Sequence, residues 1–256
     1  MWLAAATLVD SRGTVIRITE VLGGAVDRFG GSALSAASTA LGIGWREKVD
    51  EIVKRALTRV FGLSTLGFDS NADRLPSPRL NKLVGTVSGM VGGFFGLPGL
   101  AVDLPITTAV ILRSVAEIAR SHGEDISSAE GKRACLEVFT LGGPTIGDED
   151  MEAGYWAARV GLSTLGTGMV LQQAARFLGI ALSEKVLAQA IPAIGAVAGG
   201  GLNYIFVDYY QQMARVHFTV RELERRSGDE FAVRACFNAL VKQHQKQKTV
   251  KPRTGA

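Results

Sequence analysis

Two long uncharged stretches rich in glycine limit what this chain can fold into. Residues 83–102 (LVGTVSGMVGGFFGLPGLAV) contain six glycines in twenty residues, and a second uncharged stretch covers residues 186–207. Each is long enough to cross the hydrocarbon core of a bilayer. Glycine weakens a helix by about 1 kcal/mol relative to alanine, so helices built from these stretches need a closely packed partner or lipid. Both a membrane hairpin and a buried hairpin are compatible with this pattern.

The glycines recur at helical spacing. Steps of four residues return to one face of a helix, where glycine forms a groove that another backbone can approach closely. A phosphate-binding loop would need a lysine and a hydroxyl residue after the glycines, and a dinucleotide-binding loop would need a preceding strand. We therefore predict helix packing and no nucleotide cofactor. The predicted packing glycines are Gly85, Gly89, Gly93, Gly96, Gly195 and Gly199.

Polar residues inside the uncharged stretches decide between bundle and bilayer. A third uncharged stretch, residues 160–175, favours membrane insertion, as does the length of the first two. Against insertion, four polar residues are poorly suited to hydrocarbon, namely Gln172, Gln173, Gln189 and Asn203, and Pro98 interrupts the first stretch near its end. The balance favours a soluble or peripheral helical bundle, with insertion as the alternative.

Composition and periodicity predict an all-α fold. Apolar residues make up 47% of the chain and aromatic residues only 7%, and small apolar side chains suit closely packed helices better than a sheet. We predict a multi-helix bundle with glycine-rich close-packed hairpins and no sheet. Pro98 and Pro105 should bracket a break in the chain. The expected helices cover residues 14–28, 34–60, 106–122, 135–141, 150–164, a segment capped by Ser183, 202–226 and 229–246.

The net charge of +4 comes from the C-terminal end. Residues 242–256 hold five basic residues and no acidic one, which leaves 23 basic against 24 acidic residues elsewhere. The body therefore lacks the basic stripe of a nucleic-acid-binding protein. We divide the chain into an N-terminal helical segment (1–66), a helical domain (67–246) and a basic flexible tail (247–256). The N-terminus lacks a basic region before its short apolar run, so it does not resemble a signal peptide and a cytoplasmic location is expected.

Two helices carry regularly spaced polar residues. One has Arg113, Glu117, Arg120 and Glu124 at steps of four, three and four, and the other has Asn203, Tyr210, His217 and Glu224 seven apart, with Arg221 one turn from His217. If the two stripes face each other, Glu117 and Glu224 could meet Arg221 and Arg113. One interpretation is an ion-pair network that fixes helix register. The other is an acid–base site that uses His217, with Glu224 or Asp208 as the orienting carboxylate.

Other catalytic and metal-binding patterns are missing from the sequence. His122, His217 and His244 do not have metal-ligand spacing, and neither HExxH nor CxxC occurs. Ser88 lies in GTVSG rather than in a nucleophile elbow, and Cys135 lies in an apolar helical segment. We therefore expect no metal, and the sequence supports no catalytic class.

Three blocks carry a resemblance to a known family. They are residues 88–125 (SGMVGGFFGLPGLAVDLPITTAVILRSVAEIARSHGED), 135–143 (CLEVFTLGG) and 191–228 (IPAIGAVAGGGLNYIFVDYYQQMARVHFTVRELERRSG). In this order they resemble the EcsC family of bacterial proteins, over residues 68–228. The resemblance implies an α-helical module linked to membranes, because the family's namesake is encoded beside an ABC exporter. It carries no catalytic residues over to this chain.

These observations together predict a non-enzymatic, cytoplasmic, all-α protein, peripheral at the inner face of the cell membrane. It would bind a membrane surface or a lipid-like ligand, with a membrane transporter as a further partner, and would be accessory to transport or secretion. No nucleic acid is expected as a partner. The alternative is a hydrolase that acts on a hydrophobic substrate through a polar cluster. The candidate cluster consists of Asp103, Arg113, Glu117, Asn203, Asp208, His217, Arg221 and Glu224.

Overall fold

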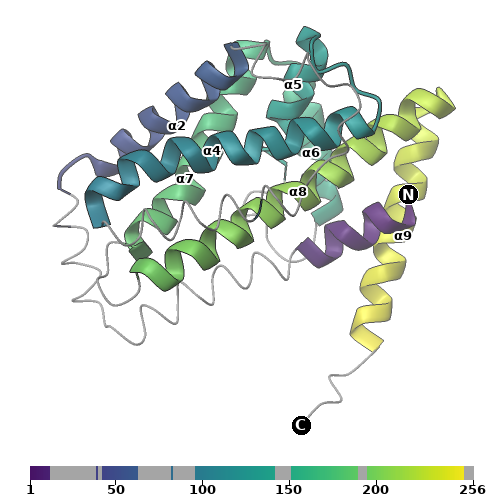
Figure 1. Cartoon of the computed structure of the whole chain (residues 1–256). Helices are drawn as coiled ribbons and strands as arrows, with labels where there is room; N and C mark the ends of the chain where they lie inside the picture. The colour runs from purple at the N-terminus through teal and green to yellow at the C-terminus, as the bar shows by residue number, and fades with distance from the viewer. Residues whose placement is uncertain are drawn as a thin grey trace.

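The computed structural model describes residues 1–11, 39, 42–62, 82, 96–141, 151–189 and 195–250. Every regular secondary-structure element in this part of the chain is an α-helix and none is a strand (Figure 1), which confirms the predicted all-α fold. A helix over residues 2–11 is followed by α2 (Trp45–Gly62), α4 (Gly96–Ser121), α5 (Ala129–Glu137), α6 (Met151–Ser163), α7 (Thr167–Gln189), α8 (Gly195–Ser227) and α9 (Glu230–Val250).

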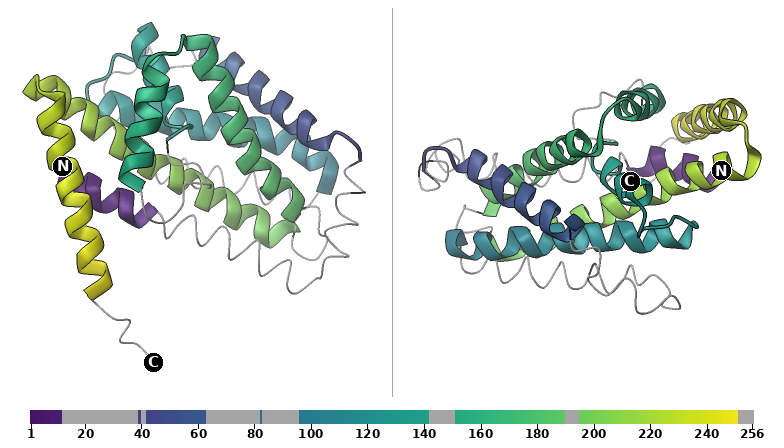
Figure 2. Two further views of the ribbon diagram at one scale, coloured as in Figure 1. Left: turned by 180° about the vertical axis from the view of Figure 1, so that it is seen from behind. Right: turned by 90° about the horizontal axis from the view of Figure 1, so that it is seen from above.

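The long helices α4, α7 and α8 form the body of the bundle. Helix α4 packs along α8, and α2 packs against both α7 and α4. Helix α9 packs against the end of α8, and the N-terminal helix lies beside α9 (Figures 1 and 2), where the Trp2 and His244 rings are 5.7 Å apart. An apolar stripe along α2 explains its position, since Val49 and Val53, one turn apart, are both buried.

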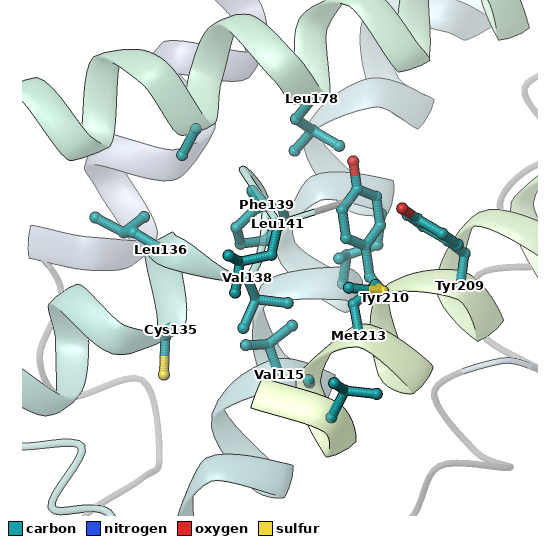
Figure 3. Close-up of a cluster of buried hydrophobic side chains, with 14 of the residues drawn as sticks. Val115, Cys135, Leu136, Val138, Phe139, Leu141, Leu178, Tyr209, Tyr210 and Met213 are labelled. Atoms are coloured by element: carbon teal, nitrogen blue, oxygen red, sulfur yellow. The ribbon is translucent and has the colours of Figure 1, made fainter. Parts of the chain in front are cut away.

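The core lies where α4, α5, α7 and α8 meet. Figure 3 shows Val115 of α4, Leu178 of α7 and Met213 of α8 converging with the turn that follows α5. Phe139 in that turn is buried and its ring lies 5.1 Å from that of Tyr210 on α8. Residues 138–141, which follow α5, are therefore part of the core rather than a surface loop.

The predicted break between Pro98 and Pro105 is wrong. Helix α4 begins at Gly96 and continues through both prolines to Ser121. Pro98 lies in the first turn, where a backbone amide needs no helical acceptor, so proline is tolerated there. Pro105 lies in the helix interior, where it removes one hydrogen bond. Burial of Leu104, Ile111 and Val115 on the same helix offsets this loss.

Several predicted helix ends differ from the structure for a related reason. Helix α7 is continuous from Thr167 to Gln189, with Ser183 buried within it rather than capping a new helix. Helix α8 begins at Gly195 and includes the three glycines 199–201, whereas the predicted helix begins at residue 202. In both helices packing against neighbours holds residues of weak propensity in helical form. Helix α9 continues to Val250, so its last turn extends into the segment predicted as a flexible tail.

Helix α5 also begins earlier and ends earlier than predicted, since it covers Ala129–Glu137. The capping residue is Ser128, whose hydroxyl accepts a hydrogen bond from the Gly131 amide at 2.9 Å. Asp125 accepts hydrogen bonds from both the amide and the hydroxyl of Ser127, which shapes the preceding turn.

Half of the predicted packing glycines lie outside the described residues. Gly85, Gly89 and Gly93 lie there, as does the helix expected over residues 14–28. Gly96, Gly195 and Gly199 lie in the first turns of α4 and α8. Their role in helix packing stays a prediction. In the part of the chain that the structure describes, no helix has the length and apolar character needed to cross a membrane.

Candidate functional site

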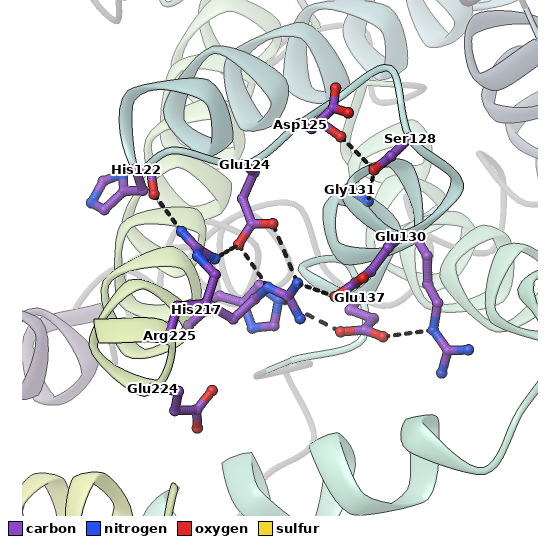
Figure 4. A network of polar contacts seen from close by, with 12 residues as sticks. His122, Glu124, Asp125, Ser128, Glu130, Gly131, Glu137, His217, Glu224 and Arg225 are labelled. Carbon is purple, nitrogen blue, oxygen red and sulfur yellow. Dashed lines mark hydrogen bonds and ion pairs between the residues drawn. The ribbon is translucent and has the colours of Figure 1, made fainter. Parts of the chain in front are cut away.

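A network of ion pairs joins the end of α4 to α5 and α8 (Figure 4), with Glu124 at its centre. Gly123, with φ of 78°, ends α4 and turns the chain so that Glu124 can reach α8. Glu124 accepts Arg221 Nε at 2.8 Å and also pairs with Arg225. Burial alone would raise the pKa of Glu124, but the hydrogen bonds and charges of the two arginines outweigh it and lower the pKa.

The same arginines secure the neighbouring helix ends. Arg225 Nη2 donates to the His122 carbonyl oxygen at 2.6 Å and so satisfies a backbone group at the end of α4. Arg221 Nη2 also donates to Glu130 of α5 at 3.0 Å. Arg221 therefore holds two carboxylates from different elements and has its donors directed at them.

Helix α5 continues the network towards α6 through Arg133. Its Nε donates to Glu137 at 3.0 Å, one turn along the same helix, and its Nη1 donates to the Leu165 carbonyl oxygen at 2.8 Å. Its Nη2 donates to the carbonyl oxygen of Leu162, in the last turn of α6. A single side chain of α5 thus caps the C-terminal end of α6.

A two-fold hydrogen-bonded ion pair connects α6 to α8. Arg159 donates to both oxygens of Glu224, at 2.7 and 2.8 Å, in the planar geometry that makes such pairs strong. Both side chains are mostly buried, at 17% and 11% exposed. The Arg159 guanidinium also lies 5.1 Å from the centre of the Trp156 ring, and Trp156 Nε1 donates to Asn238 of α9 at 2.7 Å.

His217 lies inside this network and is completely buried. Its Nε2 is 3.6 Å from Glu137 Oε2, too far for a hydrogen bond, and within the described residues neither ring nitrogen has a hydrogen-bond partner. Burial lowers the pKa of His217 well below its usual range, and the charges of Arg159 and Arg221 lower it further. His217 is therefore a neutral core side chain without the solvent access that a general base needs.

The structure does not assemble the predicted acid–base site. Glu224 binds Arg159, and Asp208 binds Lys82 at 2.5 Å, so neither orients His217. The carboxylate beside His217 is Glu137. Asp208 also accepts a hydrogen bond from Gln212, one turn further along α8.

The eight predicted cluster residues lie at separate places along α4 and α8. Asp103 accepts a hydrogen bond from Asn203 at 3.1 Å and one from Thr107 at 3.2 Å, in a buried contact between the two helices. Asn203 is fourteen residues from His217, or about 21 Å along a helix. A stripe repeated every seven residues thus contributes to several sites rather than one.

Arg113 and Glu117 also differ from the prediction. Arg113 Nε pairs with Glu117 on its own helix at 3.0 Å, and its side chain is 59% exposed. The expected pairing of Glu117 and Glu224 with Arg221 and Arg113 is therefore not the arrangement observed, since Arg221 binds Glu124 and Glu130 and Glu224 binds Arg159. Within one helix the (i, i+4) pair forms regardless of what lies opposite.

The predicted cluster lacks several residues of this network, among them Arg133, Glu137 and Arg159. Arg133 and Glu137 were detectable as an (i, i+4) pair of opposite charge. Arg159 is the only charged residue between Glu152 and Arg176, and an arginine in such an apolar helix needs a partner. The identity of that partner, Glu224, depends on how α6 and α8 pack.

The structure also bears on the candidate nucleophile Cys135 and on metal binding. Cys135 is buried, and burial together with the nearby Glu124 raises the pKa of its thiol to about 12, so it is not an activated thiolate. Among the described residues, no group of three histidine, cysteine, aspartate or glutamate side chains could hold a metal ion. The network as described fixes helices relative to one another.

A protein-family model for the EcsC protein family matches residues 68–223, more than half of the chain. The chain belongs to the EcsC family. No curated protein and no solved structure matches it. The EcsC match covers the network from Glu124 to Arg221 and begins close to the predicted domain start at residue 67. Helix α2 lies outside the match, yet it packs against α4 and α7 within it.

Proposed function

We propose that this EcsC family protein is a non-enzymatic helical protein that attaches peripherally to a lipid surface. The observation that supports this is the exposure of large apolar side chains. Trp2, Leu3, Ile43, Val160 and Met169 are each more than half exposed. Single exposed apolar residues are ordinary on soluble proteins, but two of these are adjacent in the N-terminal helix and two border one turn between α6 and α7.

The polar network supports the non-enzymatic part of the proposal. Its arginines and glutamates are engaged with one another, and His217 is buried and neutral. A hydrolase would need an acid–base group that reaches its substrate. The geometry therefore does not favour the alternative of a hydrolase that acts through this cluster.

Flotation with liposomes tests the proposed function. Full-length protein is mixed with vesicles of phosphatidylcholine alone or with phosphatidylglycerol, and its distribution is measured after centrifugation in a density gradient. We expect a fraction of the protein to float with the vesicles and none to float without them. Protein that stays at the bottom of the gradient with both lipid compositions would rule out peripheral lipid attachment.

A further inference from the structure

The turn between α6 and α7 is exposed and carries no charge. No charged residue occurs from Val160 to Ala175, although nine residues between 160 and 173 are exposed. Val160 in the last turns of α6 and Met169 in the first turn of α7 are each 58% exposed. Gly161, Gly166 and Gly168 have open space where a side chain would be. We refer to residues 160–170 as the α6–α7 tip.

The polar groups of this tip are largely satisfied from within the protein. Ser163 and Thr164 turn their hydroxyls back to the carbonyl oxygens of Val160 and Gly161, at 2.8 and 3.0 Å. Arg133 donates to the carbonyl oxygens of Leu162 and Leu165. The end of a helix normally leaves these carbonyl groups to water. Here they keep their hydrogen bonds when water is removed.

From this combination we propose that the α6–α7 tip is the surface that enters the lipid, an inference that rests on the proposed function. Hydrocarbon offers no hydrogen bonds, so a segment that enters it must satisfy its own polar groups. A protein partner would instead be expected to use roughly one hydrogen bond per 100–200 Å² of interface. A charge-free tip with internally bonded hydroxyls and carbonyl groups fits the lipid better.

The residues behind the tip suit the headgroup region. Gln172 and Gln173 are exposed one turn after Met169, and the exposed Arg176 follows one turn later. Arg176 is therefore about 10 Å from Met169 along α7, within reach of lipid phosphates when Met169 is inserted. Glu130 is exposed on α5, one turn from Arg133. Glu130 is already paired with Arg221, and the tip itself carries no charge, so binding through the tip depends on apolar contact rather than on anionic lipid.

Charge substitutions at the tip test this inference. Val160→Asp and Met169→Asp are compared with Phe231→Asp, which places the same charge on an exposed apolar position at the start of α9. We expect each tip variant to lower the vesicle partition coefficient about ten-fold or more, the effect of losing the burial of one large apolar side chain. The Phe231→Asp protein should bind like the wild type. Binding to phosphatidylcholine vesicles should persist in high salt.

A labelled variant provides a direct readout. Met169→Cys carries an environment-sensitive fluorophore in a Cys236→Ser background, since Cys236 is exposed and Cys135 is buried. We expect a blue shift on adding phosphatidylcholine vesicles. If the wild type floats but the tip variants bind equally well and the label does not shift, the tip inference fails while the proposed function stands. If the wild type does not float, both fail. Loss of an oligomer in the tip variants without vesicles would identify the tip as an interface between copies and overturn the inference.

Discussion

Gly131 and Gly161 show how the surroundings of a residue decide what a substitution does. A Cβ atom on Gly131 would lie 2.0 Å from the carbonyl oxygen of Asp125. The Ser128 cap brings this turn against the first turn of α5, which leaves no room for a side chain. Gly161, in the last turns of α6, has no atom within 4 Å of the equivalent position.

We predict opposite effects of alanine at these two positions. Gly131→Ala should lower the free energy of unfolding by about 1–3 kcal/mol, because backbone atoms would have to move. Gly161→Ala should raise it by up to about 1 kcal/mol, because alanine has the higher helix propensity. Urea denaturation of both variants measures the two changes. Equal effects of the two substitutions would mean that the turn before α5 does not contact Gly131 closely.

At the scale of elements, α6 is attached to the bundle by a few specific contacts. The Arg159–Glu224 pair joins it to α8, Arg133 caps its end from α5, and the Tyr155 and Trp156 rings pack against Phe237 of α9. These side-chain contacts fix the position of α6 relative to α5, α8 and α9.

We predict that replacing both members of the Arg159–Glu224 pair by apolar residues changes the free energy of unfolding little. Replacing only one member should lower it strongly. Arg159→Met leaves Glu224 mostly buried without its two hydrogen bonds and should lower the free energy of unfolding by about 2–4 kcal/mol. The double variant Arg159→Met/Glu224→Met should recover most of this loss, because no charge is left without a partner. A double-mutant cycle in chemical denaturation measures the coupling. A single variant as stable as the wild type would contradict the burial of this pair.

At the scale of the whole molecule, His217 makes stability depend on pH. Its pKa in the folded protein is well below 6.5, because burial disfavours the charged form. The unfolded chain therefore binds a proton below about pH 6.5 that the folded protein does not bind. The stability that neutral His217 contributes is present above this pH and is lost as the pH falls from 6.5 towards the folded-state pKa.

We predict that the free energy of unfolding falls by up to about 1.4 kcal/mol per pH unit from this residue between pH 6.5 and 5. His217→Gln, which is neutral throughout, should show a correspondingly smaller slope. Glu124 has a lowered pKa and acts on stability only below its unfolded value near 4.5, so it does not contribute in this window. Denaturation curves at four pH values compare the two proteins. An unchanged slope in the variant would mean that His217 is accessible to protons in the folded state.

Much of the fold followed from local patterns. The helical periodicity predicted an all-α protein, and Gly228, with φ of 68°, ends α8 where expected. The helix at 150–164 corresponds closely to α6. The errors occur at Pro105, Ser183 and the triple glycine before residue 202, where local propensity indicates a break but the helix continues. Propensities amount to about 1 kcal/mol for glycine and 3 for proline, which burial of a few large side chains can exceed.

The candidate site divides in the same way between sequence and tertiary structure. The sequence alone determined which residues carry charge inside apolar helices, and hence that Arg221 and Glu224 need partners. Only the tertiary structure decided that Glu224 meets Arg159, 65 residues away in sequence, and that Glu137 rather than Glu224 lies beside His217. Spacing along a helix specifies a face, because it is set by the 3.6-residue period of a local structure. Which face of which other helix lies opposite depends on how all the helices pack together, and no local period contains that information.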